Sequence, residues 1–163
     1  MTTESTAREL AGRTQDHLNE YIIAADRKAS ILITGQFAFL GLAATAISNL
    51  VRVTESWFRG FVIATAVLGI LAILLAIVVI YPRTPSPSEG FIYWGNITQH
   101  GSADDFHDAV TSLNDEGKLK TLNEENYALA TVAKTKYRYL RWSLRATVAM
   151  VLSAAAGGIT FVL

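Results

Sequence analysis

The chain contains no cysteine, and only three of its 163 residues are proline. The missing thiols exclude disulfides, a cysteine nucleophile and thiolate metal sites. Charge is also scarce, because Asp, Glu, Lys and Arg make up 17% of the residues, where a typical soluble domain has about 25%. The formal net charge is zero, so no overall basic field attracts nucleic acid, and we expect no nucleic-acid partner.

The motifs of common enzyme classes are missing as well. The sequence has no glycine-rich phosphate loop, no dinucleotide fingerprint and no nucleophile elbow. His100, Asp104 and His107 could share one side of a helix start, as metal ligands would. Gly101 and Ser102 indicate instead that the helix begins after His100, which favours a solvated polar face. We therefore predict no enzyme activity, no catalytic residue, no metal site and no cofactor.

Three long stretches carry almost no charge, at residues 29–50, 60–81 and 146–163. A bilayer core of about 30 Å needs about 20 apolar residues in a helix. The first two stretches meet that length, and the third does so once Trp142 and Leu144 join it. The pattern predicts an all-α membrane protein with three transmembrane helices and helical cytoplasmic extensions.

The chain divides into four predicted segments, separated where charge and hydropathy change. The first is a cytoplasmic amphipathic helix that continues into span one, the second is the hairpin of spans one and two, the third is a cytoplasmic linker with a helical section, and the fourth is span three. Their ranges are 1–28, 29–81, 82–141 and 142–163.

The section between spans two and three opens with a proline-rich, stiff linker at 82–88. The aromatic segment 89–100 reads as a short extended segment or an interfacial loop. Ser102 and Asp105 resemble a capping box and predict a helix that continues to about residue 113. We then expect a turn at 114–117 and a long helix that runs from about Leu122 into span three.

Lysine and arginine near the ends of the spans predict the orientation. Arg27 and Lys28 precede span one, and a run of cations at 134–145 precedes span three. The short loop between spans one and two holds only Arg52 and Arg59. We therefore predict a cytoplasmic N-terminus and a C-terminus outside.

Asp26 lies at the cytoplasmic mouth of span one, where a carboxylate is costly unless it is paired or wet. Simple anchoring explains Arg27 and Lys28 but leaves Asp26 unexplained. The neighbouring positions on its helix face carry no cation, so a partner must come from another segment. Anchoring and inter-helix pairing both remain open. Pairing predicts a cation of the basic stripe in 134–141 (Lys134, Arg138 or Arg141), or Lys28 of a neighbouring subunit, as the partner.

A basic stripe follows one face of the last helix, at Lys134, Arg138, Arg141 and Arg145, with Tyr137 beside it. Cations of this kind can snorkel to an anionic leaflet, which contributes about 1 kcal/mol per cation. The alternative is an anion site, because arginine offers planar donors to phosphate and an aromatic ring can stack a base. Both interpretations remain open.

Three parts of the sequence carry a family resemblance: YIIAADRKASILITGQFAFLG at 21–41, FIYWGNI at 91–97 and KYRYLRWSLRA at 136–146. With them the chain resembles the PycTM family, the small transmembrane effectors of bacterial Pycsar anti-phage systems. The resemblance implies that a cyclase makes a cyclic pyrimidine mononucleotide during infection, cyclic UMP or cyclic CMP. The effector would then impair the inner membrane and cause growth arrest or cell death.

The resemblance brings no assignment of ligand residues, so the nucleotide-site hypothesis rests on charge and aromatic character. The candidate nucleotide-binding residues are Asp26, Lys28, Trp94, Asn96, Lys134, Tyr137, Arg138 and Arg141. Because the soluble segments are short and three spans cannot enclose a pore, we expect a homo-oligomer. The competing interpretation is a membrane-anchored adaptor or scaffold that binds a protein partner through its cytoplasmic section.

Overall fold

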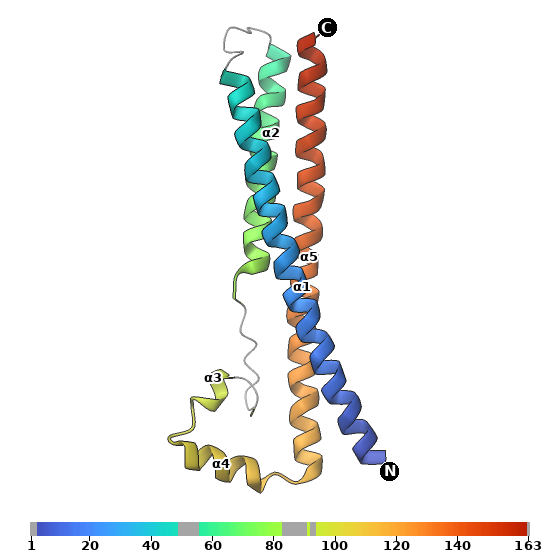
Figure 1. Ribbon diagram of the computed structural model, residues 1–163, viewed down its shortest axis with the longest axis vertical. Helices are drawn as coiled ribbons and strands as arrows, with labels where there is room; N and C mark the ends of the chain where they lie inside the picture. Colours follow the sequence, from blue (N-terminus) through green and yellow to red (C-terminus); the bar gives the residue numbers. More distant parts are fainter. Residues whose placement is uncertain (1–2, 49–55, 83–90, 92–93, 163) are drawn as a thin grey trace. The chain divides into compact units, whose positions relative to one another are not determined.

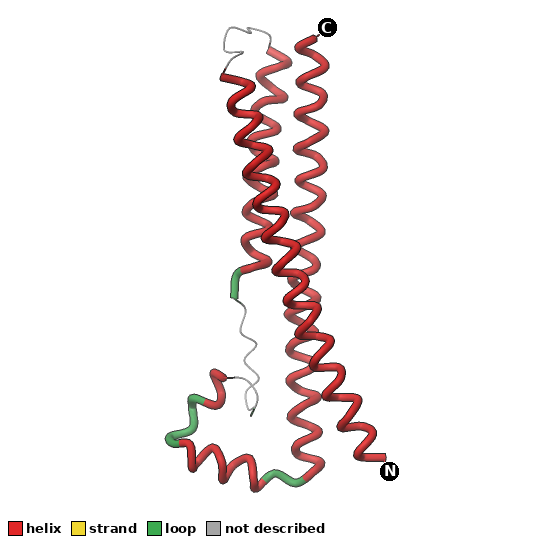
Figure 2. The backbone as a smooth tube through the Cα atoms, viewed as in Figure 1, coloured by secondary structure: helices red, strands yellow, loops and turns green. Residues whose placement is uncertain are grey.

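The computed structural model describes residues 3–48, 56–82, 91 and 94–162, and all regular structure in these ranges is helical (Figure 1, Figure 2). The helices are α1 (Thr3–Ser48), α2 (Ser56–Ile80), α3 (Trp94–Ile97), α4 (Ala103–Ser112) and α5 (Asp115–Val162). Three of them, α1, α2 and α5, contain a window long and apolar enough to cross a membrane. The predicted all-α fold with three membrane-spanning helices is confirmed.

Most helix ends agree with the sequence signals, and the differences have local causes. The hydroxyl of Ser102 accepts the backbone N–H of Asp105 at 3.1 Å and caps α4, as the capping pattern predicts. The predicted turn at 114–117 is wrong, because α5 already begins at Asp115. The side chain of Asn114 caps that start by accepting the Gly117 N–H at 2.7 Å. Residues 115–117 therefore belong to the first turn of α5 and not to a separate turn before it.

The aromatic segment after span two also differs from its prediction. Residues 94–97 form the single helical turn α3 rather than an extended strand or a loop. Backbone bonds from Gln99 to Asn96 and from His100 to Ile97 extend this turn toward α4. The stiff linker predicted at 82–88 lies almost wholly outside the described residues, as does most of the loop between spans one and two.

The chain forms two compact units. The charged unit comprises residues 1–24 and 82–134, and the apolar unit comprises residues 25–81 and 135–163. The long helices α1 and α5 each contribute residues to both units. These boundaries reflect packing density, whereas the predicted segment boundaries reflect hydropathy.

The apolar unit is a bundle of parts of α1, α2 and α5, and its buried positions recur every seven residues. A seven-residue repeat keeps one seam of each helix facing its neighbours with a left-handed supercoil. The seam consists of Phe58, Thr65, Ala72 and Val79 on α2, and of Lys136, Ser143, Met150 and Gly157 on α5.

The outer surface of this bundle is apolar. Large side chains such as Phe37, Ile63, Val67, Ile70 and Leu152 are each more than half exposed. In water such a surface would drive aggregation, whereas in a bilayer these side chains contact lipid tails. The apolar unit is therefore the membrane-spanning part of the protein.

The charged unit packs the first turns of α1 against the first turns of α5. The amide of Asn126 donates to the carbonyl oxygen of Ala11 at 2.8 Å, and both residues are buried. Near the start of α1, the Nη2 atom of Arg8 lies 2.9 Å from the Oδ1 atom of Asp115. The short helices α3 and α4 belong to the same unit.

Candidate functional site

The strongest candidate site is a buried lysine that joins all three helices of the apolar unit. The Lys136 side chain on α5 is only 4% exposed. Its Nζ atom lies 2.5 Å from the Oδ1 atom of Asp26 on α1 and 2.6 Å from the carbonyl oxygen of Val79 on α2. A buried ammonium is tolerated only when its N–H donors have acceptors, and these two oxygens accept its hydrogen bonds.

The position of Val79 explains why α2 contributes to this contact. α2 ends at Ile80, so the Val79 carbonyl is one of the last four in the helix and has no partner within it. The C-terminal end of a helix also carries a partial negative charge, which favours a nearby cation. The ammonium of Lys136 therefore donates both to a free carbonyl at the end of α2 and to the carboxylate of Asp26.

Small side chains make room for this ion pair. Ala25 and Ala29 lie on the same part of α1, and both are completely buried with Val79 and Leu140 in one apolar cluster. The Asp26 side chain is 37% exposed. The lysine of the pair is therefore buried, whereas the carboxylate is partly accessible from the surface. Asp26 thus has a partner on another helix, as the pairing interpretation predicts, but this partner is Lys136 and not one of the stripe cations Lys134, Arg138 and Arg141.

A second polar contact repeats the same arrangement one heptad along α5. The hydroxyl of Ser143 donates to the Ala72 carbonyl on α2 at 2.8 Å, and the Gln36 amide on α1 donates to Ser143 at 3.3 Å. The same Gln36 amide donates to Thr147 at 2.7 Å. Lys136 and Ser143 therefore form two rungs of a polar seam, and each rung links α5 to both other helices.

The basic stripe predicted as an anion site lies on the surface of the helix. Lys134, Arg138 and Arg141 are all exposed, and Arg138 lies over the Tyr139 ring at 5.4 Å. Lys28 lies over the Tyr137 ring at 5.7 Å, so these two candidates are neighbours within the apolar unit. Their contacts are cation–π contacts within the protein, and a nucleotide role for them stays a prediction.

Two other candidates belong to the charged unit. Asn96 is buried in α3, and the side chain of Trp94 lies outside the described part of the chain. Of the predicted nucleotide-binding residues, the structure brings Asp26 against Lys136 and Lys28 against Tyr137. Ligand binding by the predicted set is a hypothesis that these contacts do not address.

His100, a metal-ligand candidate that the sequence disfavoured, lies among aromatic rings. His100 stacks on Phe91 with ring centroids 6.0 Å apart and meets Phe106 edge-on at 5.3 Å. Over the described ranges, no three His, Asp or Glu side chains are grouped so that they could hold a metal ion. His100 is therefore part of an aromatic cluster.

Sequence reasoning missed the centre of the site. Lys136 was counted only among the cations that precede span three, and Gln36, Ser143 and Thr147 were read as ordinary residues of apolar stretches. The available signal was the seven-residue spacing from Lys136 to Ser143, Met150 and Gly157, which places two polar side chains on the buried seam of α5.

The arrangement is suited to holding helices together rather than to catalysis. The ammonium of Lys136 is already bonded on two sides, and Gln36 and Ser143 bond to each other. Separating the helices would leave a charge and several hydrogen-bonding groups without partners in a lipid environment, where water cannot replace them. Such a seam stabilises one defined packing of the three helices.

Comparison with known proteins places this site in context. The profile of the PycTM family, described as the Pycsar effector protein domain, matches residues 10–163. The Pycsar effector protein SaPycTM of Staphylococcus aureus is 34% identical over 128 residues, which cover 78% of each chain. No solved structure matches the chain significantly.

Proposed function

Because the chain belongs to the PycTM family of Pycsar effector proteins, we propose that this anti-phage effector senses a cyclic pyrimidine mononucleotide and then impairs the membrane. The nucleotide is cyclic UMP or cyclic CMP, made in the cell during infection. The bacterial inner membrane is the site of action, and the result is growth arrest or cell death.

The observation that carries the proposal is the buried Lys136, which forms an ion pair with Asp26 and a hydrogen bond to the Val79 carbonyl. An effector of this kind must be harmless until its signal arrives, so its membrane part needs a closed state with a defined barrier. The polar seam supplies this state, because the bonds of Lys136 and Ser143 to α1 and α2 exist only while the three helices stay together. In the apolar unit, Val79 and Met150 are completely buried.

The same seam supplies the polar groups that an open state needs. Ion or water leakage requires polar side chains that face a shared space rather than lipid. Lys136, Asp26, Gln36 and Ser143 are the groups that rearrangement of the bundle would release. A nucleotide can drive the change only if it binds the open state more tightly than the closed one.

We further propose that the active form is a homo-oligomer. Three spans are too few to surround an aqueous path, so several copies must contribute. Glycines on the outer faces of the bundle suit close helix approach. A β-carbon added at Gly35, Gly41 or Gly158 meets nothing within 4 Å inside the described chain, so these faces are open to a neighbouring copy.

The orientation in this proposal has the N-terminus and the charged unit in the cytoplasm and the C-terminus outside. It rests on the cations that precede spans one and three. The charged unit then faces the compartment in which a bacterial cyclase releases its product.

Leakage from liposomes tests the function directly. Purified protein is reconstituted into dye-filled vesicles and treated with cyclic UMP, cyclic CMP, linear 5′-UMP or buffer. We expect dye release only with a cyclic pyrimidine nucleotide. Leakage that is equal in all four samples, or absent from all of them, would reject the gated effector, and co-purification of a protein partner without nucleotide would then support the adaptor.

A further inference from the structure

The charged unit contains a cavity of about 580 Å³ between the start of α1, the helix α4 and the first turns of α5. Small-molecule sites usually have volumes of about 300–1,000 Å³. All the described residues that line the cavity belong to one compact unit. The size of the cavity therefore admits a mononucleotide without a contribution from the apolar unit.

One wall of the cavity is aromatic. Phe91 and Phe106 line it with their ring centroids 6.2 Å apart, and His100 packs against both rings from outside the lining. His107, the neighbour of Phe106 on α4, also lines the cavity. Flat, sequence-tolerant stacking on aromatic rings is the usual way in which proteins hold a nucleobase.

The lining of the cavity also contains two cations. Arg8 on α1 and Lys118 on α5 both line the cavity. None of its described lining residues is a carboxylate, and the three aspartates of α4 are exposed elsewhere on that helix. An anionic ligand in the cavity would therefore meet the side chains of Arg8, Lys118 and His107.

An anion already occupies the position between the two cations. The Oδ1 atom of Asp115 lies 2.9 Å from Nη2 of Arg8 and 3.8 Å from Nζ of Lys118. Arg8 beside Asp115 holds the pKa of that carboxyl below its usual range, with a smaller contribution from Lys118. Geometry that suits a carboxylate also suits a phosphate oxygen, because guanidinium donors bind both in the same way.

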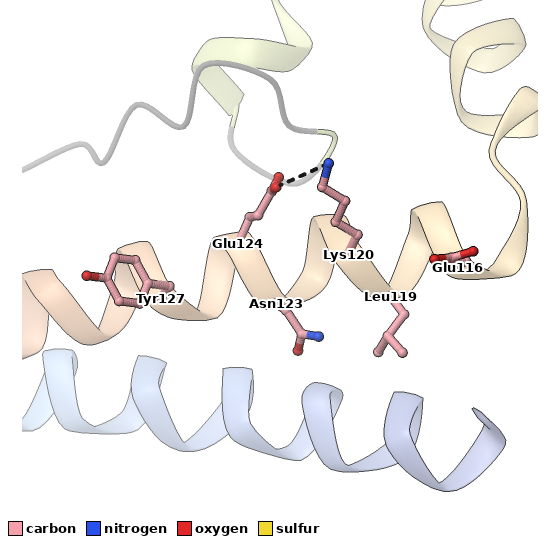
Figure 3. A pocket seen from close by; sticks show the side chains of 6 residues that line it. All are labelled: Glu116, Leu119, Lys120, Asn123, Glu124 and Tyr127. Atoms are coloured by element: carbon pink, nitrogen blue, oxygen red, sulfur yellow. Dashed lines mark ion pairs between the residues drawn. The ribbon is translucent and has the colours of Figure 1, made fainter. Parts of the chain in front are cut away.

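The other hollows of the structure lack this combination. The surface formed by Glu116, Lys120, Glu124 and Tyr127 lies along α5 alone, with an ion pair of 3.8 Å between Lys120 and Glu124 (Figure 3). The hollow of the apolar unit is lined by apolar side chains and Thr65, without a cation. The cavity beside α4, in contrast, joins aromatic rings to two cations.

We propose that this cavity is the nucleotide site, with the base against Phe91 and Phe106 and the cyclic phosphate between Arg8 and Lys118. The inference rests on the proposed function and differs from the sequence-based set, which centred on Trp94 and the stripe at 134–141. The phosphate takes the place of the Asp115 carboxylate on Arg8. Binding thus replaces the Arg8–Asp115 contact between α1 and α5 with a contact between Arg8 and the phosphate. The same two helices carry Asp26 and Lys136 further along the chain.

Binding measurements on the full-length protein test the site, with a matched control for each cation. Arg8→Gln is compared with Arg13→Gln, an exposed arginine of α1 that pairs with Glu9. Lys118→Gln is compared with Lys120→Gln, which lies outside the cavity. Calorimetry uses cyclic UMP, cyclic CMP and inorganic phosphate, and the helix content of each variant is checked by circular dichroism.

We expect Arg8→Gln and Lys118→Gln each to weaken nucleotide binding at least tenfold, while both controls bind like the wild type. Phe106→Leu, which keeps an apolar side chain but removes the ring, should weaken cyclic nucleotide binding with retained helix content. Wild-type affinity in all three cavity variants, together with a loss in Arg138→Gln or Arg141→Gln, would overturn this site and leave the gated effector intact. If the wild type binds no cyclic nucleotide, the proposed function itself fails.

Discussion

The two units of the chain each bury a charged side chain of α5, and they do so in different ways. In the apolar unit, the buried ammonium of Lys136 has Asp26 and the Val79 carbonyl within 2.6 Å. In the charged unit, Glu125 is 5% exposed, and burial raises the pKa of its carboxyl. The apolar unit pairs its buried cation with two oxygens, whereas desolvation in the charged unit favours the neutral acid of Glu125.

The difference follows from the surroundings of the two units. Around the apolar unit, lipid cannot solvate a charge, so an unpaired ammonium would carry its full desolvation cost. Around the charged unit, water can exchange protons with a carboxyl during brief opening, so a partner is less necessary. The buried Lys136 of the apolar unit therefore links helices, whereas the buried Glu125 of the charged unit has a raised pKa.

Breaking the ion pair should have the largest effect on stability. Asp26→Asn leaves Lys136 with only the Val79 carbonyl, and we expect a loss of about 2–3 kcal/mol, because the exposed side of Asp26 admits some solvent. Thermal unfolding in detergent measures the loss, with Arg27→Gln as an exposed control. In cells, removal of the carboxylate by Asp26→Ala should abolish toxicity or make it independent of nucleotide.

A second substitution shows whether the pair itself is responsible. Replacing both partners in Asp26→Asn with Lys136→Met removes the buried charge and should recover part of the lost stability. Equal melting of Asp26→Asn and the wild type would mean that the pair does not hold the bundle closed.

Packing between α2 and α5 should give the next largest effect. A β-carbon at Gly157 would lie 3.0 Å from the β-carbon of Phe61, whereas one at Gly158 meets nothing within 4 Å. Gly157→Ala should therefore be about 1–2 kcal/mol less stable than Gly158→Ala, because overpacking is costly and both variants share the same gain in helix propensity. Chemical unfolding of the two variants side by side gives this difference, and identical midpoints would show that α2 and α5 do not pack closely here.

The smallest effect concerns Glu125 and depends on pH. Its folded-state pKa lies above the ordinary value of 4.5, so the ionised form destabilises the charged unit. Glu125→Gln should raise the melting temperature at neutral pH, and the gain should shrink as the pH falls below the folded-state pKa and disappear below 4.5. Glu124→Gln, at the exposed neighbouring position, should show no such gain, and a constant difference at all pH values would contradict the burial argument.

Much of the fold was predictable because the signals are local. Apolar length predicted three spans, and the Ser102 cap predicted the start of α4. The start of α5 was missed because Asn114 resembles a turn residue until its side chain is seen to accept the Gly117 N–H. The need for a partner of Asp26 was also predictable, because an isolated carboxylate at a membrane edge is costly.

By itself, the sequence determined that the chain is helical, that it spans a membrane, and that it resembles a family of membrane effectors. Which cation meets Asp26 was decided only by the tertiary structure. Charge counting pointed to the stripe of Lys134, Arg138 and Arg141, but the packing seam of α5 turns Lys136 inward and leaves that stripe exposed. The cavity beside α4 was equally hidden, because its aromatic and cationic walls come from segments far apart in the chain. Hydropathy and charge are properties of each residue, whereas burial and pairing depend on which helix faces meet.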